Sequence, residues 1–245
     1  MKANYQTYLQ GDNGKAVLLM HGLTSGAAQM IPMARFINDY GYSVSCVNLA
    51  GHGTYPEDLN KTTAEDMVLK AKYDYENLRK YHDTVYVGGI STGGLLSLML
   101  ASIYPEIRGI VSIAAPAKLV PGSFISVDYA DKSEFLIRPL EGKTGIFKKY
   151  HIHYERIAVR IFDELRRLMD IVVNEAVLSE VKCPVLLIHS GNDDIAEPGS
   201  VDIISNMLVK SEVEVFQPST GGHLSVRSED REHVFRKTID FLGTR

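Results

Sequence analysis

Short runs of aliphatic and β-branched residues alternate with longer helical patterns along most of this chain. The short runs contain few polar residues, which is typical of strands buried on both faces of a sheet. They predict strands at residues 16–20, 42–49, 84–87, 109–114, 185–189 and 213–217. Helical periodicity predicts helices between them at residues 27–40, 63–81, 92–104, 200–208 and 229–242. This order predicts an α/β fold in which helices flank a mostly parallel central sheet.

Two of the helix ends are also marked in the sequence. Thr62 and Glu65 have the spacing of a capping box at the start of the second predicted helix. Pro105 predicts the end of the third helix, because proline has no N–H and cannot continue a helix.

One segment, about residues 118–181, breaks the alternation. It contains no convincing buried strand, and a strongly helical tract at 152–178 follows a loop with Gly142 and Gly145. We therefore predict a single domain over residues 1–245, with a short helical cap inserted at about 118–181.

The sequence Gly89-Ile90-Ser91-Thr92-Gly93 joins a predicted strand directly to a predicted helix. A serine on such a sharp turn is held in strained backbone geometry with its hydroxyl raised toward solvent, and the glycines let strand and helix approach closely. The helix N-terminus favours negative charge that develops on a carbonyl oxygen during attack. A phosphate-binding loop is disfavoured because the turn lacks the Lys-Ser/Thr pair. Ser91 is therefore predicted as a nucleophile, with a plain structural turn as the alternative.

A serine nucleophile needs a base within hydrogen-bond reach, and the base needs a group that orients it. His223 follows Gly221-Gly222 in a loop between the last predicted strand and the last helix, which suits a base. Asp193 and Asp194 lie in the loop after the predicted strand 185–189. Either could orient the histidine, and the other could cap the next helix.

Together these motifs resemble small carboxylesterases and monoacylglycerol lipases of the α/β-hydrolase superfamily, particularly compact bacterial esterases with a short helical cap. The resemblance spans nearly the whole chain and implies an α/β-hydrolase fold with the chain order serine, acid, histidine. Its five signals, in order, are Met20-His21-Gly22-Leu23, Gly51-His52-Gly53, the turn around Ser91, Val185-Leu186-Leu187-Ile188-His189 leading to Asp193, and Gly222-His223.

The resemblance also implies which aspartate is the acid. Aligning Pro198 with the proline that usually closes this loop favours Asp193, and Asp194 stays the alternative.

An oxyanion hole is implied as well, formed by the backbone N–H groups of Leu23 and Thr92. Thr92 departs from the larger Met, Leu or Gln that the family usually has there. His21 and His52 are then expected to hold loops in place rather than to act as the base.

These residues predict a carboxylesterase that hydrolyses short- to medium-chain esters through Ser91, His223 and Asp193, by way of an acyl-enzyme and without a cofactor or metal. Monoacylglycerol lipase and feruloyl or cinnamoyl esterase activities are alternatives that use the same machinery. Dehalogenase and epoxide hydrolase chemistry is disfavoured, because such relatives place Asp at the position of Ser91. A non-catalytic homologue that binds a small ligand is the alternative from another class.

Two features of the cap are weaker signals. His151 and His153 lack nearby cysteine or carboxylate ligands, so a metal site is disfavoured there. The apolar residues of the cap pack it onto the body or line an acyl pocket; they are Phe124, Phe135, Leu136, Ile137, Ile146 and Phe147.

Charge and hydropathy limit the classes of partner that we expect for this chain. A net charge of −4 gives no broad positive field, so the expected partner is a small ester rather than nucleic acid. No segment approaches the roughly 18 apolar residues of a membrane span, so stable membrane insertion is not expected. The first ten residues lack the pattern of a secretory signal, which predicts a cytoplasmic location. Cys46 and Cys183 are expected to be buried thiols, and the oligomeric state is not predicted.

Overall fold

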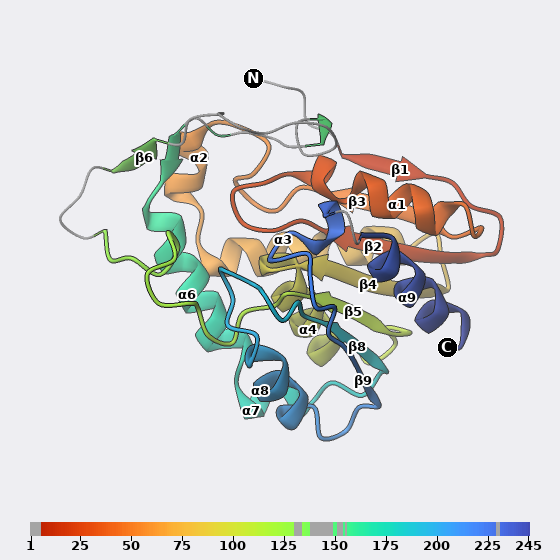
Figure 1. The fold of residues 1–245 in the computed structure, drawn as a ribbon. Coiled ribbons are helices and arrows are strands. Elements are labelled where there is room, and N and C mark those ends of the chain that lie inside the picture. The colour runs from red at the N-terminus through yellow and green to blue at the C-terminus, as the bar shows by residue number, and fades with distance from the viewer. Residues whose placement is uncertain (1–5, 130–133, 138–148, 151–153, 155, 229–230) are drawn as a thin grey trace.

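The structure is a computed structural model that describes residues 6–129, 134–137, 149–150, 154, 156–228 and 231–245. Within these residues seven strands form one sheet in the spatial order β1-β3-β2-β4-β5-β8-β9 (Figure 1). Only the edge strand β1 is antiparallel to its neighbour, so the predicted mostly parallel sheet is confirmed. The strands are β1 (Thr7–Leu9), β2 (Lys15–Met20), β3 (Ser43–Val47), β4 (Thr84–Ile90), β5 (Ile110–Ile113), β8 (Val185–Ile188) and β9 (Val213–Phe216).

Alternate strand residues point into two separate cores, one on each face of the sheet. In β2, Ala16, Leu18 and Met20 belong to one core, whereas Val17 and Leu19 belong to the other. Both sets are almost fully buried, which explains why this strand reads as a continuous apolar run rather than an alternating one.

Helices cover both faces (Figure 1). The first core is completed by α3, α4, α6 and α8, and the second by α1 and α9, which contact each other. The helices are η1 (Ala27–Met30), α1 (Ile31–Asn38), α2 (Pro56–Lys61), α3 (Ala64–Arg79), α4 (Thr92–Ile103), α6 (Arg160–Val172), α7 (Glu175–Leu178), α8 (Ser200–Met207), η2 (Ser225–Arg227) and α9 (Arg231–Gly243).

Outside the predicted cap, the predicted strands and helices are present with shifted ends, and the short elements β1 and α2 were missed. The predicted helix 27–40 begins as the 3-10 turn η1 and becomes α-helical at Ile31, with Pro32 in its first turn. The strand β1 was missed because its three residues carry no apolar run, and α2 because it is a short, polar helix.

The predicted capping box is one residue out of register. Thr63, not Thr62, precedes α3: its Oγ1 accepts from Asp66 N at 3.1 Å, while its own N–H donates to Asp66 Oδ2. Thr62 instead follows α2, and its hydroxyl donates to Asp58 O at 2.8 Å. The prediction was wrong because α2 was not foreseen, so the residue that ends it was assigned to the next helix.

The segment predicted as a cap contains β6 (Phe135–Ile137) and β7 (Arg156–Ala158), which pair antiparallel, followed by α6 and α7. The prediction of one helical tract from residue 152 was therefore wrong at its start. Ile157 and Ala158 are buried in extended conformation, and regular α-helix begins only at Arg160.

Helix α6 is tied to the body by charged side chains. Glu164, which is almost fully buried, accepts from the Ala64 N–H at the start of α3 at 2.9 Å and pairs with Arg160 at 2.8 Å. Arg167 also pairs with Glu65 on α3. A carboxylate at a helix N-terminus satisfies an N–H that has no partner within the helix, so these contacts fix where α6 lies.

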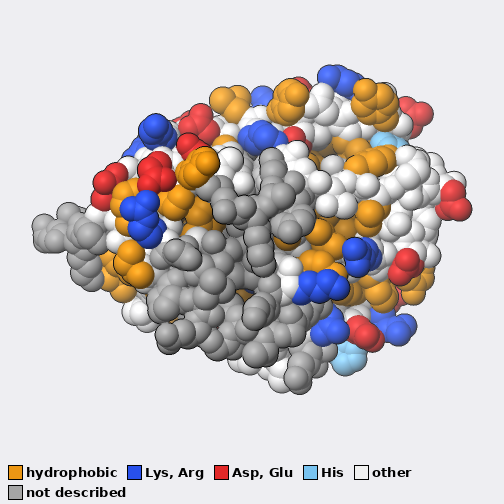
Figure 2. Space-filling model, turned by 90° about the horizontal axis from the view of Figure 1, so that it is seen from above, with side chains coloured by type: hydrophobic (Ala, Val, Ile, Leu, Met, Phe, Trp, Pro, Cys, Tyr) orange, Lys and Arg blue, Asp and Glu red, His pale blue; other side chains and the backbone are white. Residues whose placement is uncertain are grey.

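The surface shown in Figure 2 carries both signs of charge. Lys and Arg side chains lie among Asp and Glu around its rim, with hydrophobic side chains between them. Among the described residues, no helix combines the length and apolar character needed to cross a bilayer.

Candidate active site

Ser91 lies at the turn between β4 and α4, where its backbone adopts φ 55° and ψ −116°. A non-glycine residue in this region is strained, by on the order of 1–3 kcal/mol, and persists only when its surroundings hold it. The Ser91 N–H donates to Ile113 O at 2.7 Å, and its carbonyl accepts from Leu95 N at 3.1 Å. The turn is therefore anchored to the next strand and to the helix that it begins.

The two glycines around Ser91 are required by close packing. A Cβ at Gly89 would lie 2.4 Å from the carbonyl carbon of Gly93, and one at Gly93 would lie 2.3 Å from Met20 O. Both clashes are with backbone atoms, which cannot move aside as the end of a side chain can. This is the physical basis of the G-x-S-x-G pattern in this chain.

A cavity of about 340 Å³ opens beside Ser91. Apolar and polar side chains contribute to its wall in similar numbers. The lining residues are Gly22, Leu23, Thr24, Ser25, Gln29, Ile90, Ser91, Phe124, Ile125, Asp194, Ile195, Gly221, Gly222, His223, Leu224 and Arg227. Ser91 and His223 thus face one cavity, although 132 positions separate them in the sequence.

The imidazole of His223 is held by Asp193. His223 Nδ1 lies 2.9 Å from Asp193 Oδ2 and 3.1 Å from Oδ1. Because a carboxylate can only accept, Nδ1 carries the proton, and Nε2 of the neutral ring is left with a lone pair. This is the tautomer that a general base requires.

Asp193 is kept ionised by its neighbours. Its side chain is fully buried, yet Oδ1 also accepts from the backbone N–H groups of Ile195 and Ala196, each at 2.9 Å. Burial acts to raise the pKa of Asp193, but the hydrogen bonds from His189 and His223 and from the backbone outweigh it and hold this pKa below its ordinary value. Asp194, the other candidate, is exposed and lines the cavity.

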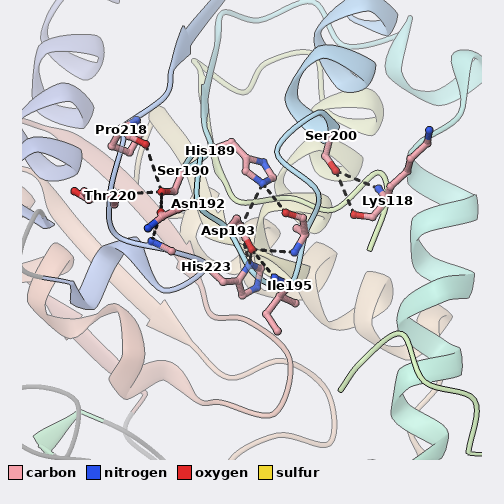
Figure 3. A network of polar contacts seen from close by, with 12 residues as sticks. Lys118, His189, Ser190, Asn192, Asp193, Ile195, Ser200, Pro218, Thr220 and His223 are labelled. Atoms are coloured by element: carbon pink, nitrogen blue, oxygen red, sulfur yellow. Dashed lines mark hydrogen bonds and ion pairs between the residues drawn. The ribbon is translucent and has the colours of Figure 1, made fainter. Parts of the chain in front are cut away.

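Two side chains fasten the Asp193 loop to the His223 loop (Figure 3). Ser190 Oγ lies 2.9 Å from Thr220 O and 2.6 Å from Asn192 Oδ1, and Asn192 Oδ1 accepts from Gly222 N at 3.0 Å. The backbone adds a bond from Gly191 N to Pro218 O. The separation of the acid and the histidine is therefore set by a network and does not depend on their contact alone.

The loop after β2 brings Leu23 to the cavity beside Ser91. A Cβ at Gly22 would lie 3.4 Å from Ser91 Cβ, so this loop approaches the nucleophile turn closely. The Gly22 N–H donates to Gln29 Oε1 at 2.8 Å, which fixes the loop's orientation. Thr92 begins α4, so its N–H has no acceptor one turn earlier in the helix.

His21 and His52 hold this loop as neutral rings. His21 Nε2 accepts from Leu49 N at 3.0 Å, and His52 Nε2 accepts from Thr24 N at 3.2 Å. The other nitrogen of each ring lies 2.8 Å from Gly22 O and 2.7 Å from Ala50 O, respectively. Burial lowers the pKa of His21 well below its ordinary value and that of His52 to about 4.

Two residues of the site were missed from the sequence. Gln29 is almost fully buried, and the available signal was an amide side chain inside an otherwise apolar helical pattern. Arg227 lies four residues after His223, is 1% exposed and lines the cavity, and burial lowers its pKa to about 10. No pattern in the sequence distinguished this arginine from a surface residue.

The remaining sequence predictions are placed as follows. Cys46 and Cys183 are buried free thiols, as predicted, and burial raises the pKa of each to about 12. Phe124 lines the cavity. His151, His153, Ile146 and Phe147 lie outside the described residues. Within the described part of the chain, no group of three or more His, Cys, Asp or Glu side chains is arranged to hold a metal ion.

The geometry can be compared with known proteins. Residues 11–224 match the Hydrolase_4 family model, described as serine aminopeptidase, S33. The chain belongs to this family. Its fold is that of the α/β-hydrolases, and it is an esterase- or lipase-type hydrolase.

Three relatives illustrate this membership. A thermostable monoacylglycerol lipase from Bacillus sp. (strain H-257) is 32% identical over 95% of this chain and 92% of its own length. A carboxylesterase from Bacillus subtilis (strain 168) is 27% identical over 96% and 94%. A solved structure from the description of LipS and LipT, two metagenome-derived lipolytic enzymes, superposes with a TM-score of 0.86 at 25% identity, covering 99% of this chain and 98% of that one.

Proposed function

We propose that this hydrolase is a carboxylesterase that cleaves short- to medium-chain esters by two-step acyl transfer. Ser91 is the nucleophile, His223 the general base and Asp193 the acid that orients it. The observation that carries the proposal is that Ser91, in its strained turn, shares a cavity with a histidine whose Nδ1 is held by a buried carboxylate.

In the first step His223 Nε2 takes the proton of Ser91 Oγ as that oxygen attacks the ester carbonyl carbon. The resulting imidazolium is stabilised by the negative charge of Asp193. His223 then gives the proton to the departing alkoxide, which leaves as the alcohol, and the acyl group stays on Ser91. In the second step water attacks the acyl-enzyme with the same base, releasing the carboxylic acid and restoring the serine.

The charge on the carbonyl oxygen is taken up by the backbone N–H groups of Leu23 and Thr92. Leu23 belongs to the loop whose Gly22 lies against Ser91, and Thr92 contributes the first N–H of α4. Preorganised donors of this kind stabilise the transition state by roughly 3–4 kcal/mol each in comparable enzymes.

The substitution Ser91→Ala tests the nucleophile. We expect kcat on p-nitrophenyl butyrate to fall by about 10⁶-fold, because a serine of this kind cannot be replaced by the rest of the site. A fluorophosphonate probe should label the native chain once per molecule and leave the variant unlabelled. Near-native turnover in Ser91→Ala would contradict the proposal. A folded native chain that the probe does not label would instead favour a non-catalytic ligand-binding protein.

Monoacylglycerol hydrolysis is the second candidate, favoured by the 32% identity to a monoacylglycerol lipase over nearly the whole chain. The two candidates differ in the alcohol that leaves, glycerol or a simple alcohol, and not in the catalytic groups. Comparing kcat/KM for monoacylglycerols and for methyl esters of the same acyl chains separates them.

A further inference from the structure

His189 is a buried residue that the proposed mechanism does not use. It follows β8 directly, and its side chain is 2% exposed. Its Nε2 lies 3.3 Å from Asp193 Oδ2 and 3.3 Å from Ala196 O. Both neighbours are acceptors, so Nε2 carries a proton that the two oxygens share.

The Asp193 carboxylate lies between two imidazoles, with His189 on one side and His223 on the other (Figure 3). Backbone N–H groups of Ile195 and Ala196 donate to Oδ1, whereas no backbone N–H of the described residues donates to Oδ2. The side-chain contacts at Oδ2 are the hydrogen bond from His223 at 2.9 Å and the His189 Nε2–H group at 3.3 Å. Without His189, one side of this buried oxygen loses its donor.

We propose that His189 is a positioning residue for hydrolysis: its Nε2–H fixes the rotation of the Asp193 carboxylate and thereby aims His223 at Ser91. The inference rests on the proposed function, because it assigns His189 to the same acid and base.

Two consequences follow for the reaction. Loss of the donor lets the carboxylate rotate, so His223 is less well aimed and kcat falls while KM changes little. The same loss concentrates the negative charge of Asp193 on its contact with His223, which favours the imidazolium form of that ring. The acid limb of the pH profile of kcat/KM then moves to higher pH. In the described part of the chain, the ionisable side chains that contact Asp193 are His189 and His223, and Asp194 is its exposed neighbour in sequence.

The test compares His189→Leu with His189→Gln. Leucine fills much of the space without a donor, whereas the glutamine amide can donate to Asp193 Oδ2. We expect kcat on p-nitrophenyl butyrate to fall by about 10- to 100-fold in His189→Leu and by only about threefold in His189→Gln, with KM within twofold in both. The midpoint of the acid limb of the kcat/KM profile should move to higher pH by about half a unit in His189→Leu and stay unchanged in His189→Gln.

A second readout does not depend on turnover. Proton NMR is measured on variants that also carry Ser91→Ala. The low-field resonance of His223 Nδ1–H should persist in His189→Gln and should shift or disappear in His189→Leu. Three results would overturn the inference: an equal loss of kcat in both variants, an acid limb of kcat/KM in His189→Leu that matches the native chain, or an unchanged His223 resonance in His189→Leu. Failure of the native chain to react with the fluorophosphonate probe would refute the proposed function instead, and the resonance would still report whether His189 orients Asp193.

Discussion

Two pairs of buried histidines lie in loops that follow strands of the sheet, and the groups that surround the two pairs differ. His21 and His52 lie among backbone groups, and their rings are 5.1 Å apart. His189 and His223 share the Asp193 carboxylate. Within the first pair, a positive charge on either ring would be buried, and the described hydrogen-bond partners of both rings are backbone groups rather than carboxylates. In the second pair, a charge that develops on His223 is met by Asp193. The side chain is the same, but in the proposed mechanism only His223, beside the carboxylate, takes up a proton.

After Ser91→Ala, the largest expected effect comes from a substitution that disrupts the second pair. Asp193→Asn should lower kcat by about 10⁴-fold on p-nitrophenyl butyrate, because an amide favours the wrong tautomer of His223 and cannot stabilise its imidazolium. Circular dichroism checks that the variant is folded. Asp194→Asn is the matched control and should retain kcat within about threefold, because Asp194 is exposed. A larger loss at Asp194 would reassign the acid.

The two pairs should also lose stability in different pH ranges. The folded-state pKa of His52 is about 4 and that of His21 is lowered too, so their stabilisation is present above the ordinary value of 6.5 and is lost as pH falls toward 4. For His52 this amounts to on the order of 3 kcal/mol of unfolding free energy. The pKa of Asp193 is also lowered, but its stabilisation is lost only below its ordinary value of 3.8.

Urea unfolding at pH 7.5 and pH 4.5 measures how much unfolding free energy is lost over the pH range of His21 and His52. In His52→Gln the difference between the two pH values should shrink, because the amide can replace both hydrogen bonds and does not titrate. A variant whose pH dependence matches that of the native chain would show that His52 does not carry this effect.

A smaller effect is expected from Gln29, which orients the Gly22 N–H. Gln29→Met should lower the unfolding free energy by about 1–3 kcal/mol, since the buried Gly22 N–H loses its acceptor. We also expect kcat to fall by about tenfold, because the neighbouring Leu23 N–H is less well placed. The exposed Gln217 gives the control, and Gln217→Met should change neither quantity measurably. Equal effects from the two substitutions would refute a specific role for Gln29.

The smallest effect is expected from Thr92→Val. The Thr92 hydroxyl is buried, and among the described residues it has no hydrogen-bond partner. Valine removes this unsatisfied group at nearly constant volume, so the unfolding free energy should stay equal or rise by up to about 1 kcal/mol. Because the proposed oxyanion donor is the main-chain N–H, kcat should stay within about threefold. A loss of 100-fold or more would show that the hydroxyl takes part in the reaction.

Much of the fold could be predicted because buried parallel strands leave continuous apolar runs in the sequence. The errors occur where that signal is weak. β1 is a three-residue edge strand, and β7 is a three-residue strand that pairs only with β6. α2 is a short, polar helix. None of them has the length or the periodicity by which an element is recognised in a sequence. Missing α2 also displaced the capping box by one residue, because Thr62 and Thr63 look alike until it is known which helix each one borders.

The residues of the site also differ in whether the sequence alone reveals them. The turn at Ser91 could be predicted because its G-x-S-x-G pattern lies in five consecutive residues, although the clash that requires Gly93 is with the distant Met20 O. Gln29 and His189 act through contacts across the fold or across a loop. Their residue types alone do not show that they meet Gly22 N and Asp193 Oδ2.

The sequence by itself determined the order of strands and helices, the nucleophile turn and the histidine loop, because each depends on neighbours along the chain. Only the tertiary structure decided which aspartate contacts His223, and which histidines are neutral loop supports and which flank a carboxylate. Those properties depend on distances of about 3 Å between loops at the ends of different strands. A hydrogen bond or a pKa responds to what lies within that distance, and folding, not chain order, brings those groups together.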